Sequence, residues 1–349
     1  MSRLDTETAE QPAALARFVA TVPGHLTALR ELAAGCRGVT LAARGSSDNA
    51  ARYGQYLVPL RSGLPVTLAT PSLSTVYGRA PRMTDQLVVA VSQSGRSPDI
   101  VAVLAAARSQ GRPTVAVTND PQSPLAVEAD HVVDLATGPE TSVAATKTYL
   151  TSLLGMAALA LALADPSPGD TGDDPATAEL DVLPELVSAA LTLAEEPAAD
   201  IAGDLAGATR AVAVGRGLNL STAHETALKV TELTGTLVVP FSPADLLHGP
   251  VASVGPDVPV LLIAPDEPAS ASVLEIVPGL RARGARVHVV GDAAGYDVDT
   301  VVPLPAGVPG WLSPVVAMMA GQRVARHLAA LRGVDLDHPG GLSKVTVTT

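Results

Sequence analysis

Short runs of apolar residues recur along the chain, and stretches with the apolar spacing of helices separate most of them. The runs are rich in Val, Ala and Leu, which is typical of strands buried on both faces. The predicted strands are 38–43, 65–69, 86–90, 113–118 and 131–135, followed by 210–214, 258–264 and 287–290. This alternation predicts an α/β fold of parallel sheets flanked by helices on both faces.

The strand pattern restarts in the second half of the chain. An offset of 172 residues lays Arg44-Gly45 on Arg216-Gly217 and Ala51 on Ala223, which indicates an internal duplication. Residues 165–181 are rich in Pro, Gly, Asp and Thr and are typical of an exposed linker. The predicted segments are N-terminal helices in 1–35, a first domain in 36–165, a linker in 166–182, a second domain in 183–334 and a tail in 335–349.

Two loops of the first half are rich in hydroxyl groups. One lies between the strand at 86–90 and a predicted helix at 100–107, and the other precedes a predicted helix at 50–58. Their polar residues are Ser92, Gln93, Ser94 and Ser97 in the first loop and Ser46 and Ser47 in the second. A helix N-terminus with neutral donors around it suits a phosphate monoester.

The first loop has two interpretations. No lysine follows Gly95, so it is not a nucleotide-triphosphate loop. A serine-rich turn that only caps a helix explains the four residues Ser92 to Gly95 equally well. Its counterpart in the second half, residues 264–268, lacks the motif, so only the first half is predicted to bind phosphate.

A helix predicted over 223–235 carries Glu225, Lys229 and Glu232 at i, i+4 and i+7, so the three share one face. Ser221 or Thr222 is its expected cap. A solvated, salt-bridged surface helix has the same spacing. The apolar residues between the charged ones leave little of this helix for solvent, which favours a functional site.

Two further residues are candidates for chemistry. His248 lies in a turn-rich loop, 241–250, and imidazole suits proton transfer near neutral pH. Lys344 lies in a tail with few charges, which we expect to dock. Docking would partly desolvate the amine and favour its condensation with a carbonyl. A structural histidine and a solvated tail lysine are the alternatives.

Composition narrows the class of protein. The chain has 349 residues, 47% of them hydrophobic, and a net charge of −12, which argues against a nucleic-acid partner. The single cysteine, Cys36, excludes an intrachain disulfide, and no run approaches a membrane span. We expect a soluble cytoplasmic protein without membrane contact, cofactor or metal.

The chain resembles proteins with two sugar-isomerase (SIS) domains, most closely the isomerase half of glucosamine-6-phosphate synthases and the related stand-alone deaminases. The matching motifs occur in family order and span nearly the whole chain. They are RGSSDNAARY (44–53), VSQSGRSPD (91–99), PETSVAATKTYL (139–150), GRGLNLSTAHETALKVTELT (215–234), LLHGP (246–250) and DLDHPGGLSKVTVT (335–348). The resemblance implies two tandem SIS domains, each a flavodoxin-like three-layer sandwich.

The resemblance also implies roles for the candidate residues. The phosphate of a sugar 6-phosphate would be held by the serines and glutamine of the two loops. Glu232 matches the general base that moves a proton between C1 and C2, and Lys229 and Glu225 match residues around it. His248 matches a ring-opening histidine that in this family crosses from the partner of a homodimer. Lys344 matches a C-terminal lysine that forms an imine with a ketose.

Departures from the synthase pattern affect the expected reaction. The chain begins Met1-Ser2-Arg3 without a glutaminase domain, so we expect no glutamine-dependent synthesis. Asp245 and Leu247 stand where synthases usually have Glu and Lys, and His338 where they usually have Gln. The resemblance implies that these changes sit beside the sugar.

The leading expectation is conversion of glucosamine 6-phosphate to fructose 6-phosphate and ammonia. The alternatives are a dehydratase on N-acetylglucosamine 6-phosphate, by C2–C3 elimination, and a fructosamine 6-phosphate deglycase. A further alternative, from a different class, is a non-catalytic phosphosugar sensor. The sensors among transcription regulators carry a basic helix-turn-helix segment, which the sequence lacks.

Overall fold

The structure, a computed structural model, describes residues 2–164, 175–340 and 342–344 and divides into two compact units. The N-terminal unit comprises residues 7–141, 145–182 and 343–349, and the C-terminal unit comprises 1–6, 142–144 and 183–342. Most of the predicted linker, residues 166–174, lies outside the described residues, as do residues 341 and 345–349 of the predicted tail. The predicted domain boundaries stay predictions.

The N-terminal unit contains a parallel five-stranded sheet in the order β2-β1-β3-β4-β5. Its strands are β1 (Gly38–Ala42), β2 (Val66–Leu68), β3 (Gln86–Val91), β4 (Thr114–Thr118) and β5 (His131–Asp134). Its helices are α2 (Gln11–Val19), α3 (Val22–Ala33), α4 (Ser46–Ser62), α5 (Ser72–Thr75), α6 (Pro98–Ser109), α7 (Pro124–Val127), α8 (Lys147–Leu163) and α9 (Pro175–Ala178), and α1 (Arg3–Ala9) crosses the boundary between the units. Each predicted strand of the first half is present, with its ends within one residue.

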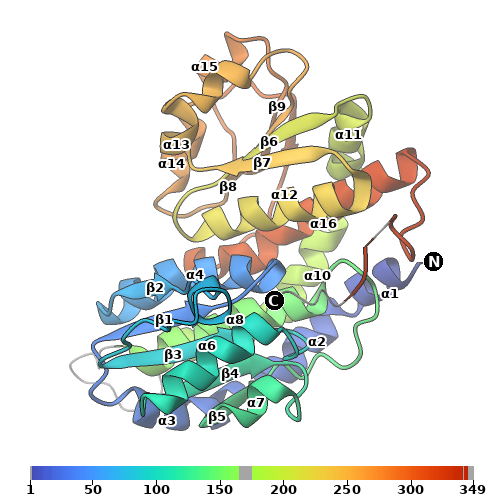
Figure 1. The fold of residues 1–349 in the computed structure, drawn as a ribbon. Helices are drawn as coiled ribbons and strands as arrows, with labels where there is room; N and C mark the ends of the chain where they lie inside the picture. Colours follow the sequence, from blue (N-terminus) through green and yellow to red (C-terminus); the bar gives the residue numbers. More distant parts are fainter. Residues whose placement is uncertain (1, 165–174, 341, 345–349) are drawn as a thin grey trace. The chain divides into compact units, whose positions relative to one another are not determined.

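Helices cover both faces of this sheet (Figure 1). On one face, Ile100 and Leu104 of α6 and Leu125 of α7 pack with strand residues such as Val88. On the other face, glycines allow a close approach. A Cβ added to Gly155 of α8 would lie 2.9 Å from Val117 of β4, and one added to Gly54 of α4 would lie 3.2 Å from Leu41 of β1. The sheet is therefore the middle of three layers, as predicted.

The C-terminal unit repeats this plan, with a parallel sheet in the order β10-β9-β8-β6-β7. Its strands are β6 (Arg210–Val214), β7 (Leu237–Phe241), β8 (Val260–Ala264), β9 (Val287–Gly291) and β10 (Thr300–Val302). Its helices are α10 (Leu183–Leu193), α11 (Glu195–Leu205), α12 (Leu220–Thr234), α13 (Pro243–Leu247), α14 (Ser270–Leu274), α15 (Val277–Arg281) and α16 (Ser313–Leu331), with 3-10 turns η1 (Gly217–Asn219), η2 (Pro250–Ser253) and η3 (Gly310–Leu312).

The two sheets correspond strand by strand when the second order is read backwards. Strand β6 takes the place of β1, and it stands between β7 and β8 as β1 stands between β2 and β3. The registers agree as well, because Thr40 pairs with Thr67 and Val88 while Val212 pairs with Val239 and Val260. Each of these residues lies 172 positions after its counterpart, which supports the predicted duplication.

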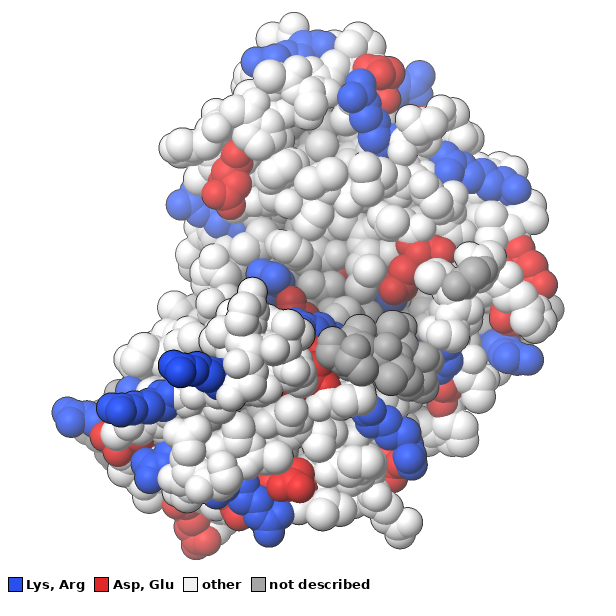
Figure 2. All heavy atoms as spheres, viewed as in Figure 1, with Lys and Arg blue, Asp and Glu red and all other residues white. Residues whose placement is uncertain are grey.

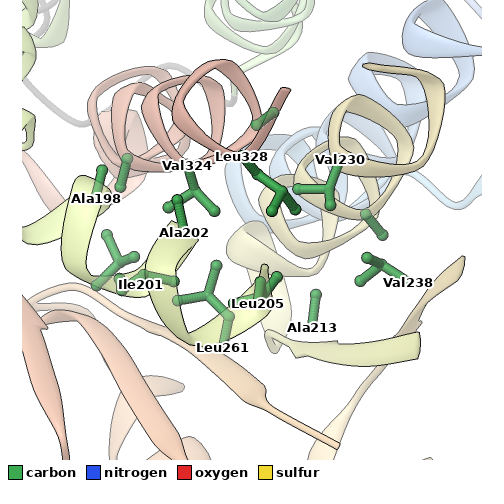
Figure 3. Packing of buried hydrophobic residues seen from close by; sticks show 14 of the residues in the cluster. Ala198, Ile201, Ala202, Leu205, Ala213, Val230, Val238, Leu261, Val324 and Leu328 are labelled. Carbon is green, nitrogen blue, oxygen red and sulfur yellow. The ribbon is translucent and has the colours of Figure 1, made fainter. Parts of the chain in front are cut away.

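The core of the C-terminal unit is built from small aliphatic residues (Figure 3). Ile201 and Leu205 of α11, Val230 of α12 and Val324 and Leu328 of α16 gather against one face of the sheet. The opposite face packs against α13, α14 and α15. This arrangement leaves α12, the predicted site helix, with a buried apolar face and a separate polar one.

Several local predictions were wrong. Helix α4 begins at Ser46 rather than at 50, because Gly45 takes a positive φ (58°) and turns the chain earlier. Helix α12 begins at Leu220, so Ser221 and Thr222 lie inside it and neither is the cap. Their hydroxyls bond back to Leu218 O and Asn219 Oδ1.

The predicted loop 241–250 contains the short helix α13. Ser242 caps it by accepting a hydrogen bond from the Asp245 N–H, and Pro243 follows directly.

The surface agrees with the charge of the sequence. Acidic and basic side chains are interspersed on the face that Figure 2 shows, where no continuous basic surface forms. Within the part of the chain that the structure describes, no helix is both long enough and apolar enough to span a bilayer.

Candidate functional site

The loop after β3 has a fixed conformation that only glycine permits at its centre. Gly95 has a φ of 60°, and a Cβ there would overlap the Ser123 hydroxyl. The carbonyl of Gln93 accepts hydrogen bonds from Asn119 N (3.0 Å) and Thr118 Oγ1 (3.3 Å) in the loop after β4. The backbone is thus held from the neighbouring strand, which leaves the Gln93 and Ser94 side chains partly exposed.

The predicted phosphate residues are placed at two helix N-termini. Ser97 stands at the N-cap of α6 with extended backbone, and its side chain makes no capping hydrogen bond. Ser46 and Ser47 form the first turn of α4, a helix of 17 residues. Ser92 is buried, whereas Ser46, Ser47, Gln93, Ser94 and Ser97 are half-buried. Hydroxyls and first-turn N–H groups are the donors that a phosphate monoester needs.

An ion pair that the sequence did not reveal joins these two loops. Arg44 Nε, two residues before Ser46, lies 2.8 Å from Oδ2 of Asp99, two residues after Ser97. The Asp99 side chain is only 3% exposed. The pair therefore fixes the start of α4 relative to the start of α6.

In the C-terminal unit, the structure brings the three charged residues of α12 together. Lys229 Nζ lies 2.5 Å from Glu232 Oε2 and 3.5 Å from Glu225 Oε1. The side chains of Lys229 and Glu225 are 3% and 1% exposed, whereas that of Glu232 is 27% exposed. The interpretation as a solvated surface helix is therefore wrong.

The neighbouring carboxylates determine the charge state of Lys229 in this triad. Burial lowers the pKa of Lys229, but the Glu225 and Glu232 carboxylates outweigh it and leave the pKa above its ordinary value. Lys229 thus stays an ammonium at neutral pH. Of the two glutamates, Glu232 is the one that a small molecule can reach, because its side chain is 27% exposed.

His248 is exposed at the C-terminal end of α13. Its Nδ1 lies 2.6 Å from Ala244 O, so Nδ1 is the donor in this hydrogen bond and Nε2 takes no part in it. Among the described residues of the C-terminal unit, no hydrogen bond or ion pair joins His248 to the triad. The structure therefore presents a positioned imidazole but does not bring it to Glu232.

The predicted docking of Lys344 has a specific partner that sequence reasoning missed. Lys344 Nζ lies 2.8 Å from Oε2 of Glu140, whose side chain is fully buried, and the Lys344 side chain is 21% exposed. Burial raises the pKa of Glu140, but Lys344 and hydrogen bonds from Thr148 outweigh it and hold the pKa below its usual range. Glu140 is thus a buried carboxylate that anchors the lysine.

The segment around Glu140 is arranged to hold that carboxylate. It accepts hydrogen bonds from Thr146 N (3.0 Å) and Thr148 Oγ1 (2.6 Å). The following lysine, Lys147, is 2% exposed and bonds Pro139 O and Glu10 Oε2. A glutamate followed by several hydroxyl residues was the available signal, since hydroxyls and N–H groups are what a buried carboxylate requires.

The fold and these motifs are those of sugar-phosphate-binding α/β domains, and the comparisons agree. The SIS domain family matches residues 34–162 and 204–298, so the chain belongs to the SIS domain family.

Among known proteins, the chain is 32% identical over 317 residues to a glutamine–fructose-6-phosphate aminotransferase (isomerizing) of Bradyrhizobium diazoefficiens, a match covering 88% of this chain and 52% of the relative. The chain thus spans about half the length of the curated relatives it matches.

Two solved structures are similar over nearly their whole length. The C-terminal domain of glucosamine-fructose-6-phosphate aminotransferase from Francisella tularensis superimposes with a TM-score of 0.88 at 25% identity, covering 97% of this chain and 98% of that one. A protein of Silicibacter pomeroyi DSS-3, provisionally assigned as a phosphosugar isomerase, has a TM-score of 0.85 at 34% identity, with 97% and 100% covered. The predicted fold class is therefore confirmed.

Proposed function

We propose that the protein is an enzyme of amino-sugar 6-phosphates that converts glucosamine 6-phosphate to fructose 6-phosphate and ammonia. The observation that carries the proposal is the α12 triad, in which a partly exposed Glu232 carboxylate lies 2.5 Å from a buried ammonium. Proton transfer at carbon needs a carboxylate whose position is fixed, and a buried salt bridge fixes it. A family of sugar-phosphate isomerases provides the matching chemistry.

The proposed reaction uses Glu232 at the carbon bearing the nitrogen. In the open-chain sugar, Glu232 removes the C2 proton, and the electron pair forms a C1–C2 enolamine. Return of a proton to C1 gives the C2 imine of fructose 6-phosphate. Water then adds to the imine carbon and ammonia leaves. Lys229 orients Glu232, since its ammonium bonds Oε2 directly.

The remaining residues have supporting roles in this proposal. Ser46, Ser47, Ser92, Gln93, Ser94 and Ser97 hold the 6-phosphate, which takes no part in the reaction. His248 opens the sugar ring through Nε2. Lys344 forms an imine with the ketose carbonyl and releases water, and hydrolysis of that imine returns the free ketose and the lysine amine. Glu225 compensates the charge of Lys229 from the other side.

The test uses two substrates and a matched pair of variants. Purified protein is incubated with glucosamine 6-phosphate and, separately, with its N-acetyl form, and ammonia and product masses are measured. Glu232→Gln should lower turnover by about 10²–10⁴-fold while leaving phosphosugar binding intact. Glu196→Gln is the control, because Glu196 is an exposed glutamate on α11.

Each outcome separates the candidate functions. Ammonia from the free amine supports the proposal. Loss of one water from the acetylated sugar alone would replace it with the dehydratase, in which removal of the C2 proton expels the C3 hydroxyl. Turnover of only fructosamine 6-phosphate would assign a deglycase. Binding without turnover of any amino-sugar phosphate would assign a sensor.

The proposal includes a homodimer in which His248 serves the site of a second copy, as the resemblance of its loop to the family implies, and the exposure of His248 is compatible with this. Mixing inactive Glu232→Gln and His248→Asn proteins and letting subunits exchange tests this. If His248 acts across the dimer, half of the dimers gain one intact site, and activity returns to about a quarter of wild type. If it acts within its own chain, mixing restores none.

A further inference from the structure

Three polar residues face one side of the N-terminal sheet where apolar ones are expected. Thr40 of β1 pairs with Thr67 of β2, so the two side chains share a face. Gln86 of β3 pairs with Gly38, two residues before Thr40, and therefore lies on the same face. A parallel sheet covered by helices normally buries aliphatic residues at such positions.

The duplicated sheet shows that the fold does not require this polarity. At the offset of 172, the counterparts of Thr40, Thr67 and Gln86 are three valines, Val212, Val239 and Val258. Val212 and Val258 belong to an apolar cluster of the C-terminal unit. The same backbone positions thus carry aliphatic side chains in one unit and hydrogen-bonding groups in the other.

The polar residues line a cavity of about 390 Å³. The wall is completed by the four-residue helix α5, by Thr70 before it, by the segment before β3 and by Val103 of α6. Thr70, Ser74 and Thr84 supply hydroxyls to it. Arg82 is also in the lining, is exposed, and has no ion-pair partner among the described residues. The volume is in the range of small-ligand sites, about 300–1,000 Å³.

We propose that this cavity is a second ligand site, which takes a phosphorylated polyol of sugar size. Neutral hydroxyls and an amide match the hydroxyl groups of a polyol, and a guanidinium free of carboxylates matches its phosphate. No carboxylate, imidazole or amine is part of the lining. The site therefore binds its ligand without catalysing a reaction.

The end of this site at Gln86 is remote from the phosphate loop. Gln86 is the first residue of β3, whereas Ser92 follows the last, Val91. Six residues of extended strand span roughly 20 Å. One sugar phosphate held at Ser92–Ser97 therefore does not reach Gln86, and the proposal does not depend on the reaction proposed above.

The chain carries a suitable reporter of this cavity. Met83 lines it and is 3% exposed, while Met318 lies buried in α16 of the C-terminal unit. We would label the methionine methyl groups with ¹³C and titrate with sorbitol 6-phosphate, which has no carbonyl to react. We expect the Met83 resonance to shift and saturate while Met318 stays unchanged, with Met83→Leu providing the assignment.

Variants decide between this site and the phosphate loop. The shift of Met83 should persist in Ser94→Ala and disappear in Thr40→Val/Thr67→Val, which copies the duplicated sheet. Arg82→Gln should weaken binding at least tenfold, whereas Arg79→Gln, an exposed arginine outside the lining, should not. Two results would overturn the proposal: a Met83 resonance that does not shift in the wild-type protein, or a shift that is lost in Ser94→Ala. Both can be measured even if the double variant fails to fold.

Discussion

His288 lies within β9 with its side chain 0% exposed, and we predict that it lowers the acid stability of the C-terminal unit. Neither ring nitrogen has a hydrogen-bond partner among the described residues. Burial lowers its pKa to about 4. The Asp299 carboxylate opposes this shift, and Arg286 and Arg281 add to it. Asp204 Oδ2 lies 3.6 Å from Nε2 and is itself paired with Arg286.

The direction of the pH effect follows from proton binding. An unfolded chain protonates this histidine near its ordinary pKa of 6.5, whereas the folded chain resists until about pH 4. Between these values the unfolded state binds more protons, so acid destabilises the fold. The resulting loss of unfolding free energy is about 1.4 kcal/mol by pH 5.5 and about 2.5 kcal/mol by pH 4.5.

Urea denaturation at pH 7.5, 5.5 and 4.5 measures this loss. Trp311 is the only tryptophan of the chain and lies in η3, so its fluorescence follows the C-terminal unit. Between pH 7.5 and 4.5, the free energy of unfolding of His288→Leu should fall by about 2.5 kcal/mol less than that of wild type. At pH 7.5 it should be more stable by about 1 kcal/mol, because the unpaired ring nitrogens are removed.

The control is His338→Gln, since the His338 side chain is 74% exposed. Its pH dependence should match that of wild type. Parallel pH profiles for wild type and His288→Leu would refute the reasoning.

Three further predictions concern the site segments. Gly95→Ala should lower the free energy of unfolding, measured by urea denaturation, by about 2–4 kcal/mol. The added Cβ would strain a residue with a positive φ and would overlap the Ser123 side chain. Gly111→Ala, with a φ of 66° and open space around it, should cost only about 1 kcal/mol, and equal losses would contradict the steric argument. Lys229→Met should lower the free energy of unfolding by about 3–5 kcal/mol at pH 7.5, because it leaves Glu225 buried without its ammonium. Adding Glu225→Gln should recover part of this loss. If the effects of the two substitutions were simply additive, the result would contradict this reasoning. Glu140→Gln should raise the acetylation of Lys344 by an amine-reactive reagent several-fold, as measured by mass spectrometry. Lys147, which is 2% exposed, should stay protected and serves as the control. Unchanged labelling of Lys344 would argue against its anchoring by Glu140.

Periodicity predicted all five strands of the N-terminal sheet and the interior strands of the C-terminal sheet, but not the two edge strands of the C-terminal sheet. The central strands are buried aliphatic runs, and β6 lies at 210–214, where its pattern placed it. The two strands missed, β7 and β10, are edge strands of the C-terminal sheet. Pro240 interrupts β7, and β10 has only three residues, so neither carries a strong strand pattern.

The candidate site was predictable where its residues share one helix. Glu225, Lys229 and Glu232 needed only the 3.6-residue repeat to be placed together, and the structure supports that placement. The Arg44–Asp99 and Lys344–Glu140 pairs join different elements, and the second spans 204 residues. Only the folded sheet and the docked tail create such contacts, so no local pattern indicates them.

The scarcity of lysine in the composition nevertheless indicates which cations form specific pairs. The chain has 23 basic residues other than histidine, and only three are lysines, Lys147, Lys229 and Lys344. Arginine therefore provides the surface charge, and each lysine has a specific position instead. All three are paired with glutamates, and the most exposed is 21% exposed. In a chain whose surface cations are arginines, the few lysines are therefore the residues to examine first for buried ion pairs. The compact ammonium suits a single carboxylate, and it releases its proton more readily than a guanidinium does.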